Sequence, residues 1–376
     1  MTFKSKILFI SPFYYPEKIS SAKYNRHLVD SLLKRINVDV YCMHPFYPDW
    51  KTEKVGCGKN IFRPNWTPKF PKSILLKRLI LEIGFFISTF FYVFKNKNKY
   101  DGLICISPPS LFLMVSIFFK KKIVIVHDLQ SIHSSESTFI LKFFSSFIRM
   151  FEKYLLSKFD IKYFLSNEML NYVNLSNSFV FYPSFNVIKK KNLYFENKLN
   201  INNKTIIYSG ALGEKQNPYK FIEFIKKFVE VNSDFCCYIF SSGPIFEHLK
   251  KIISLKNIRF YSLVDDKELF SLYNNEAIHF IPQKSNTSKG SLPSKLPNLL
   301  YCNSKIISII DKDSELDNIL KDFENNIRLY KWGYFPFFEA IIKLSKLKRK
   351  KNSSNLLSKF NQDYYVKKTV KFFNDN

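Results

Sequence analysis

The fold is decided by the stretch Tyr208-Ser209-Gly210-Ala211-Leu212-Gly213-Glu214-Lys215-Gln216, which joins a strand end, two glycines, a lysine and a helix start. Residues 205–208 read as a buried strand, and Pro218 stands at a suitable first helical position before apolar residues at helical spacing. In α/β folds such a turn holds a phosphate, because free amides at a helix start carry a partial positive charge and glycine lets a ligand approach the backbone. A tight turn beside a solvated lysine follows the same pattern, so this motif alone does not establish a site.

The alternation of strands and helices predicts an α/β architecture. Strand-like segments begin near residues 7, 38, 103, 123 and 161 with helical segments between them, and the order repeats near residues 206, 235, 258, 278 and 306. Alternation at this spacing is typical of a parallel sheet with helices on both faces. A polar, lysine-rich stretch over residues 187–203 interrupts the pattern and reads as a linker. We therefore expect two Rossmann-like domains that face each other across a cleft, residues 1–186 and residues 187–355.

A second phosphate-type element lies in the same half as the first. Pro282-Gln283 is followed by a polar loop, by Leu292-Pro293-Ser294-Lys295-Leu296 and by an apolar strand at 305–310. The two elements resemble the YSGxxGEKQ and PQ…LPSKL segments of glycosyltransferase family 4, and within it the colanic-acid biosynthesis fucosyltransferase branch. Near the start, Tyr14-Tyr15-Pro16-Glu17, Lys23-Tyr24 and Pro45-Phe46-Tyr47-Pro48-Asp49-Trp50 follow the same branch, and the resemblance runs from about Ile7 to Leu316.

The resemblance implies a GT-B fold, in which the last helix, about residues 356–376, crosses back to the first domain. It also implies that the second domain binds a UDP- or GDP-linked sugar. Two lysines suffice to hold a diphosphate without a metal, so no metal or other cofactor is expected. The expected donor-binding residues are Gly210, Gly213, Lys215, Gly243, Ser294, Lys295 and Asn298.

Three departures from the wider family bear on the donor. Gly290 and Asn298 stand where most members carry two glutamates around the last phosphate-binding helix, and Ala211 stands where an arginine often precedes the lysine. Ser20-Ser21 replaces the glycine pair that is common after the first strand. Asn298 offers the ribose an amide in place of a carboxylate. These departures leave the nucleotide open, whereas the fold does not depend on them.

The catalytic residues are expected where the strand at residues 123–126 ends, since His127 and Asp128 follow it directly. Members of the wider family often carry a His or an Asp at this point, close to the acceptor hydroxyl or the donor sugar. In a retaining transfer the leaving diphosphate helps to deprotonate the acceptor, so the enzyme mainly aligns groups and stabilises charge. A hydrogen-bonded strand cap is the structural alternative for this pair. The candidates on the acceptor side are Ser20, Ser21, Tyr24 and His133.

The charge is the unusual part of the composition. The chain has 58 Lys and Arg against 31 Asp and Glu, a formal net charge of +27. Such a balance favours anionic partners, although biased codon usage also enriches Lys, Asn, Ile and Phe. The six cysteines show no CxxC spacing and indicate reduced, buried thiols. The apolar run at the start is too short for a signal peptide, so we expect a cytoplasmic protein.

The stretch from Ile74 to Phe94 is nearly apolar, but Lys77, Arg78 and Glu82 interrupt it. A spanning helix needs about 20 apolar residues with few charges, so this stretch is not expected to cross a membrane. Phenylalanines at 85, 86, 90, 91 and 94 above a lysine cluster suit a helix lying on an anionic membrane. A buried helix of the first domain is equally consistent with the pattern, and both hold if one face lies in the core.

The resemblance implies a retaining hexosyltransferase that moves a sugar from a nucleotide diphosphate to a lipid-linked saccharide, carried on a polyprenyl diphosphate, and the basic composition suits these anionic ligands. The expected place is the inner face of the cytoplasmic membrane, in O-antigen, capsule or exopolysaccharide biosynthesis. Two alternatives stay open. A nucleotide-sugar epimerase of the same fold would need neither an acceptor nor a membrane. A basic nucleic-acid-binding protein is favoured by net charge alone, because no helix-turn-helix, zinc site or aromatic RNA-binding signature is present, so no nucleic-acid partner is expected.

Overall fold

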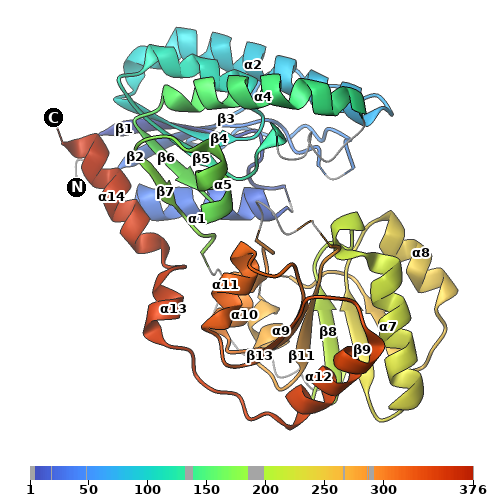
Figure 1. Ribbon diagram of the computed structural model, residues 1–376. Helices are drawn as coiled ribbons and strands as arrows, with labels where there is room; N and C mark the ends of the chain where they lie inside the picture. The colour runs from blue at the N-terminus through green and yellow to red at the C-terminus, as the bar shows by residue number, and fades with distance from the viewer. Residues whose placement is uncertain are drawn as a thin grey trace. The chain divides into compact units, whose positions relative to one another are not determined.

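The computed structural model describes residues 5–17, 19–47, 49–131, 139–184, 199–265, 267–285, 287 and 292–375. The chain divides into two compact units: unit 1 is Met1–Pro183 with Asn361–Asn376, and unit 2 is Ser184–Phe360 (Figure 1). Each unit is built on one parallel sheet with helices on both faces. The predicted α/β class with two Rossmann-like halves is confirmed.

The sheet of unit 1 has the strand order β3-β2-β1-β4-β5-β6-β7, and each strand in this order pairs in parallel with the next. The order reverses between the neighbouring strands β1 and β4. From β1 the chain continues to β2 on one side of this pair, and from β4 it continues to β5 on the other side. In open α/β sheets, ligands bind outside the carboxyl ends of the strands at such a switch point. The strands are β1 (Lys6–Ile10), β2 (Asn37–Tyr41), β3 (Ile61–Phe62), β4 (Gly102–Ser107), β5 (Lys121–Val126), β6 (Ile161–Phe164) and β7 (Ser178–Val180).

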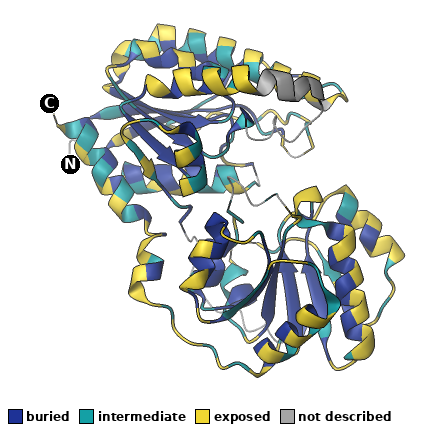
Figure 2. Ribbon diagram, viewed as in Figure 1, coloured by how far each residue is buried: buried dark blue, intermediate teal, exposed yellow. Residues whose placement is uncertain are grey.

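Both faces of this sheet are apolar, because side chains alternate along each strand and helices cover both sides. Phe85 and Phe112 belong to the core on one face, and Val366 and Phe373 belong to the core on the other. Figure 2 shows the buried strands and the exposed outer sides of the helices. The first core packs α2 (Ile74–Asn96), η2 (Leu111–Phe118), α4 (Phe139–Ser157) and α5 (Asn167–Val173), and the second packs α1 (Ser20–Leu33) and α14 (Gln362–Asn374); η1 (Lys97–Lys99) follows α2.

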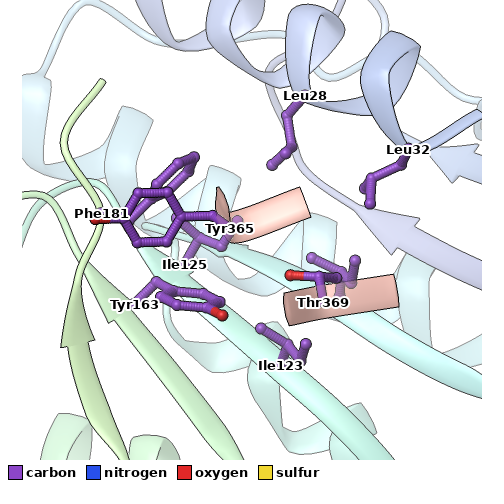
Figure 3. A pocket seen from close by; sticks show the side chains of 9 residues that line it. Leu28, Leu32, Ile123, Ile125, Tyr163, Phe181, Tyr365 and Thr369 are labelled. Atoms are coloured by element: carbon purple, nitrogen blue, oxygen red, sulfur yellow. The ribbon is translucent and has the colours of Figure 1, made fainter. Parts of the chain in front are cut away.

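The last helix, α14, belongs to unit 1, as the GT-B expectation requires. The Ser5 hydroxyl donates to the Phe373 carbonyl at 3.2 Å, and Arg35 forms an ion pair with Asp363 at 2.8 Å. Figure 3 shows Tyr365 and Thr369 of this helix beside side chains of the sheet, where they line a small cavity. The prediction that the C-terminal helix crosses back is therefore confirmed.

Unit 2 repeats the design with six parallel strands in the order β10-β9-β8-β11-β12-β13, and its switch point lies between β8 and β11. Its core is rich in phenylalanine, including Phe221, Phe228, Phe280 and Phe337. The strands are β8 (Thr205–Ser209), β9 (Cys236–Phe240), β10 (Ile258–Tyr261), β11 (Ile278–Pro282), β12 (Lys305–Ile309) and β13 (Asn326–Leu329). The helices are η3 (Glu214–Gln216), α7 (Pro218–Val231), α8 (Pro244–Ile252), α9 (Leu269–Tyr273), α10 (Leu296–Tyr301), α11 (Glu315–Lys321), α12 (Tyr334–Lys346) and α13 (Ser354–Ser358).

Candidate functional site

The predicted phosphate turn begins where β8 ends. Gly210 has a φ of 122°, a conformation that favours glycine, and nothing lies within 4 Å of the place where a Cβ would stand. Its amide donates to the Phe240 carbonyl at 3.0 Å, and the amide of Gly213 donates to the Gln216 side chain at 3.0 Å. Both amides thus have an acceptor within the protein. Lys215 is exposed on the short turn η3, and α7 begins at Pro218 as predicted.

The loop after β11 meets this turn at the switch point of unit 2. The amide of Lys284 donates to the Lys215 carbonyl at 2.8 Å, and the Thr287 hydroxyl approaches the same carbonyl at 3.4 Å. The indole of Trp332 donates to the Gln283 carbonyl at 3.1 Å, which ties the end of β13 to the same loop. The two phosphate-type elements that the sequence separates are therefore joined by direct hydrogen bonds.

Lys295 directs its ammonium group to the ends of the two strands that border the switch point. Its Nζ donates to the Phe280 carbonyl of β11 at 3.1 Å and lies 4.0 Å from the centroid of the Tyr208 ring of β8. The hydroxyl of Tyr208 in turn donates to the Ala211 carbonyl at 2.6 Å, which fixes the ring beneath the turn. Burial of the ammonium group lowers the pKa of Lys295 to about 7. The role of the Tyr208 ring was not predicted from the sequence.

The other predicted donor residues lie at the same edge of unit 2. Ser294 is exposed just before Lys295, and Asn298 is buried on α10. Gly243 precedes α8 with a φ of 104°, at the end of the strand β9, which pairs with β8. Gly210 and Gly243 are the glycines with positive φ in the part of the chain that the structure describes. Gly290 lies outside the described residues.

In unit 1, His127 and Asp128 follow β5 directly, as predicted. The amide of His127 donates to the Ser107 carbonyl of the neighbouring strand at 2.8 Å, and Asp128 accepts from the amide of Leu129 at 3.0 Å. Burial lowers the pKa of His127 to about 4, although the adjacent Asp128 opposes this shift. The imidazole is therefore neutral at pH 7. His133 lies outside the described residues.

Two carboxylates that the sequence did not single out as site residues, the buried Glu152 and the partly buried Glu82, hold the loop that carries Asp128. Glu152 of α4 accepts from the amides of Gln130 at 2.9 Å and Ser131 at 3.1 Å. Glu82 of α2 accepts from the amide of Leu111 at 2.9 Å and from the side chain of Gln130. Burial raises the pKa of both carboxyls. The sequence showed Glu82 only as a charge that interrupts an apolar helix, and its hydrogen bonds to these loops were not predicted.

The remaining acceptor-side candidates lie at the start of α1. Ser20 and Ser21 occupy its first turn, and Tyr24 lies one turn further, partly buried. Asn25 beside them is buried and donates to the Ser11 hydroxyl and the Phe13 carbonyl, both at 2.9 Å. Those bonds fix the loop after β1, so this end of α1 lies at the carboxyl edge of the sheet of unit 1.

Helix α2 has one face in the core and an apolar stripe on its outer face. Phe85 is fully buried and packs against Phe112 at a centroid distance of 4.9 Å, so of the two interpretations of this helix the buried one holds for Phe85. The exposed residues recur about every turn because the helix repeats every 3.6 residues, and they are Leu75, Leu76, Leu79, Ile83, Ile87, Phe91 and Phe94. Among the described helices, none has the length and apolar character that crossing a bilayer requires.

In the residues that the structure describes, no group of three or more His, Cys, Asp or Glu side chains is placed to hold a metal ion. The cysteines are free thiols. Most are buried, as predicted, but Cys57 is exposed in the segment that joins β2 to β3.

No family model matches the chain. The chain is 24% identical over 354 residues, 85% of this chain and 86% of the relative, to the "Putative colanic acid biosynthesis glycosyl transferase WcaI" of Escherichia coli (strain K12). Solved structures with the same fold include a sucrose-phosphate synthase from Thermosynechococcus elongatus, with a TM-score of 0.73, 13% identity and 98% of both chains covered.

Two further structures agree with this similarity in fold. WaaG, a glycosyltransferase involved in lipopolysaccharide biosynthesis, aligns with a TM-score of 0.65 and 11% identity over 98% of this chain and 95% of that chain. The catalytic domain of starch synthase IV from Arabidopsis thaliana, bound to ADP and acarbose, aligns with a TM-score of 0.62 and 11% identity over 98% of both chains. The chain has the GT-B fold of glycosyltransferases.

Proposed function

We propose that the chain is a retaining glycosyltransferase that moves a sugar from a nucleoside diphosphate to a lipid-linked oligosaccharide in the biosynthesis of a bacterial surface polysaccharide. The observation that carries the proposal is the meeting of two phosphate-type loops, with Lys215 and Lys295, at the switch point of unit 2. A relative named for colanic acid biosynthesis and a neighbour named for lipopolysaccharide biosynthesis support the polysaccharide context.

Donor binding rests on the two lysines. The ammonium group of Lys295 contacts a carbonyl and an aromatic ring, and a diphosphate oxygen is a stronger partner for a cation than either. Lys215 supplies a second, exposed charge on the adjoining turn. The open backbone at Gly210 and Gly243 lets the nucleotide approach the ends of β8 and β9. The ADP bound to a neighbour of the same fold supports this ligand class.

The chemistry that these residues supply is charge stabilisation and alignment. When the bond between sugar and diphosphate breaks, negative charge grows on the leaving oxygen, and the two lysines neutralise it. The departing diphosphate takes the proton of the acceptor hydroxyl, so no strong protein base is needed. His127 is neutral at pH 7 and orients a hydroxyl without a change of charge, while Asp128 holds the acceptor beside it.

The lipid part of the acceptor is assigned to the outer side of α2, η2 and α4. These elements pack in one core on the same face of the sheet in unit 1 (Figure 1). Phe91 is 67% exposed, Ile117 of η2 is 71% exposed and Met150 of α4 is 64% exposed, while Lys95 and Lys99 are exposed beyond the stripe. An apolar surface bordered by lysines favours an anionic bilayer, where lipid-linked acceptors reside.

The donor site is tested with a thermal-shift panel of UDP, GDP, ADP and CMP on the wild type and on a Lys215→Ala, Lys295→Ala double variant. A ligand at about 100 times its Kd stabilises the folded state by about 2.7 kcal/mol. We expect one nucleoside diphosphate to raise the melting temperature of the wild type and not of the double variant. Lys220→Ala, an exposed lysine of α7, is the matched control and keeps the shift. The absence of a shift with every nucleotide would reject this donor site.

The reaction is tested by incubating sugar nucleotides with and without a polyprenyl-diphosphate monosaccharide and following both substrates by NMR. We expect release of the nucleoside diphosphate only with the acceptor, and a product whose anomeric configuration equals that of the donor. A change in the sugar nucleotide without an acceptor would instead identify an epimerase. An inverted anomeric centre would refute the retaining mechanism and leave the donor site standing.

A further inference from the structure

Aromatic side chains gather on two loops of unit 1 that the proposed reaction does not yet use. The loop after β2 carries Phe46, Tyr47 and Trp50, with ring centroids 5.6 Å apart for Phe46 and Trp50 and 5.7 Å apart for Tyr47 and Trp50. Phe13, from the loop after β1, lies 6.0 Å from Tyr47, and Phe70 lies 5.0 Å from Trp50. Tyr47 is 41% exposed and Trp50 is partly exposed, so this cluster is not a closed core.

Two buried ionisable side chains hold the two loops together. Glu17, at the end of the first loop, is buried and accepts from the amides of Phe46 at 3.0 Å and Tyr47 at 2.7 Å. Arg63 is buried and donates to the carbonyls of Tyr15 and Met43. Burying a polar side chain costs solvation free energy unless hydrogen bonds replace those to water. The hydrogen bonds of Glu17 and Arg63 do this, and they fix the backbone of the loop that carries Tyr47.

The backbone of Trp50 adopts a φ of 57°. The left-handed region is unfavourable for a bulky side chain and costs on the order of 1–3 kcal/mol, and residues held there cluster at functional sites. In this backbone conformation the indole packs against Tyr47 and Phe70. A tight turn that served only to connect β2 to β3 would be more stable with glycine or asparagine at this position.

Helix α2 links this cluster to the loop that carries Asp128. The ammonium group of Lys77 lies 5.4 Å from the centroid of the Trp50 ring. Five residues further along the same helix, about 7.5 Å at 1.5 Å per residue, Glu82 accepts from the amide of Leu111 and from the side chain of Gln130. The loops after β2 and β5 both leave the carboxyl ends of parallel strands in one sheet, so the aromatic cluster and the loop that carries Asp128 lie at the same edge of that sheet.

We propose that Tyr47 and Trp50 form a carbohydrate-binding surface that holds a sugar ring of the acceptor, an inference that rests on the proposed glycosyl transfer. A pyranose presents an apolar face of C–H groups that packs on the electron-rich face of an aromatic ring, while its rim of hydroxyls stays hydrogen-bonded. Large rigid rings bind such a face with little loss of side-chain entropy. Lys77 and the hydroxyl of Tyr47 supply polar partners at the border.

The test uses the full chain without nucleotide and saturation-transfer NMR with four methyl glycosides: α-mannoside, β-glucoside, β-galactoside and α-L-fucoside. Aromatic protons are saturated, and transfer to the ligand is recorded. We expect transfer to the ring C–H protons of at least one glycoside, stronger than to its O-methyl group. Tyr47→Ala and Trp50→Ala each remove an aromatic contact, so transfer falls by about fivefold or more. Phe335→Ala, an exposed aromatic of unit 2, leaves it unchanged.

The Tyr47 variant keeps the test decisive if Trp50→Ala fails to fold, because the Tyr47 side chain is exposed; circular dichroism checks both. Trp50→Phe retains a ring and is expected to restore part of the transfer. No transfer with any of the glycosides, or transfer that survives both alanine variants, would overturn the proposal. Binding to phosphatidylglycerol vesicles that both variants abolish would overturn it in favour of a lipid contact. Because no nucleotide is present, failure here is separate from failure of the nucleotide panel.

Discussion

Donor binding should depend steeply on pH because of Lys295. The buried ammonium group has a pKa of about 7 in the free protein, against a usual value of 10.5. A diphosphate bound against it favours the charged form and returns the pKa toward its usual value. The nucleotide therefore binds the protonated protein, and above pH 7 each binding event must take up a proton. Affinity is greatest below pH 7 and falls as the pH rises.

The magnitude follows from that pKa. At pH 9 about 1% of the free protein carries the proton, so Kd should be about 50- to 100-fold weaker than at pH 6.5, or about 2.5 kcal/mol. A terminal phosphate titrates near pH 6, so the charge of the diphosphate changes little between pH 7 and 9. At pH 7 the free lysine is half protonated, and binding should take up about 0.5 proton per nucleotide.

Titration calorimetry with UDP and GDP measures both quantities, because the apparent enthalpy in buffers of different ionisation enthalpy reports proton uptake. Lys295→Arg keeps a permanent charge, so its affinity should not vary between pH 7 and 9. Lys215→Ala, on the exposed turn, should bind more weakly at every pH and keep the slope. A Kd for the wild type that stays constant from pH 6.5 to 9, with no proton uptake at pH 7, would refute the reasoning.

Three further perturbations test the fold and the surfaces. Burial lowers the pKa of His279 to about 3, so the stability that the neutral imidazole confers is complete above pH 6.5 and is lost as the pH falls. This residue should make the unfolding free energy about 2 kcal/mol lower at pH 5 than at pH 7, and His279→Phe should abolish that part of the difference in urea denaturation. A Phe91→Ser, Phe94→Ser variant should lose sedimentation with phosphatidylglycerol vesicles while its melting temperature stays within a few degrees, and unchanged sedimentation would exclude this surface. In Gly102→Ala the new Cβ would lie 2.3 Å from the Phe373 ring, so unfolding should become about 1–3 kcal/mol easier; wild-type stability would mean that α14 does not pack there in solution.

The fold was largely predictable because its signals are local. Strand propensity, glycine turns and helical spacing act over a few residues, and they placed β8, α7 and the loop after β11 close to where they lie. The two-residue strand β3 and the short helices α9 and α11 were missed, because segments of this length show no period. The predicted strand end at His127 was found for the same local reason.

The candidate site was predictable in its residue types and not in their surroundings. The sequence indicated Lys295 as a cation, but the Tyr208 ring beneath it comes from a strand far away in the chain. It also indicated Glu82 as an interruption in an apolar helix, while its hydrogen bonds to the loops after β4 and β5 required the folded sheet. Helical spacing alone did not show whether Phe85 and Phe91 face the core or the solvent. In the folded protein Phe85 is buried and Phe91 is exposed.

The sequence by itself determined the α/β class, the division into two halves and the two loops that are chemically suited to a diphosphate, because each depends on neighbours in the chain. Only the tertiary structure decided which charges are buried, which aromatic rings are exposed and which loops are joined. The pKa of Lys295 depends on desolvation, and the exposure of Tyr47 depends on which groups cover it; both are set by groups that packing brings together from distant parts of the sequence.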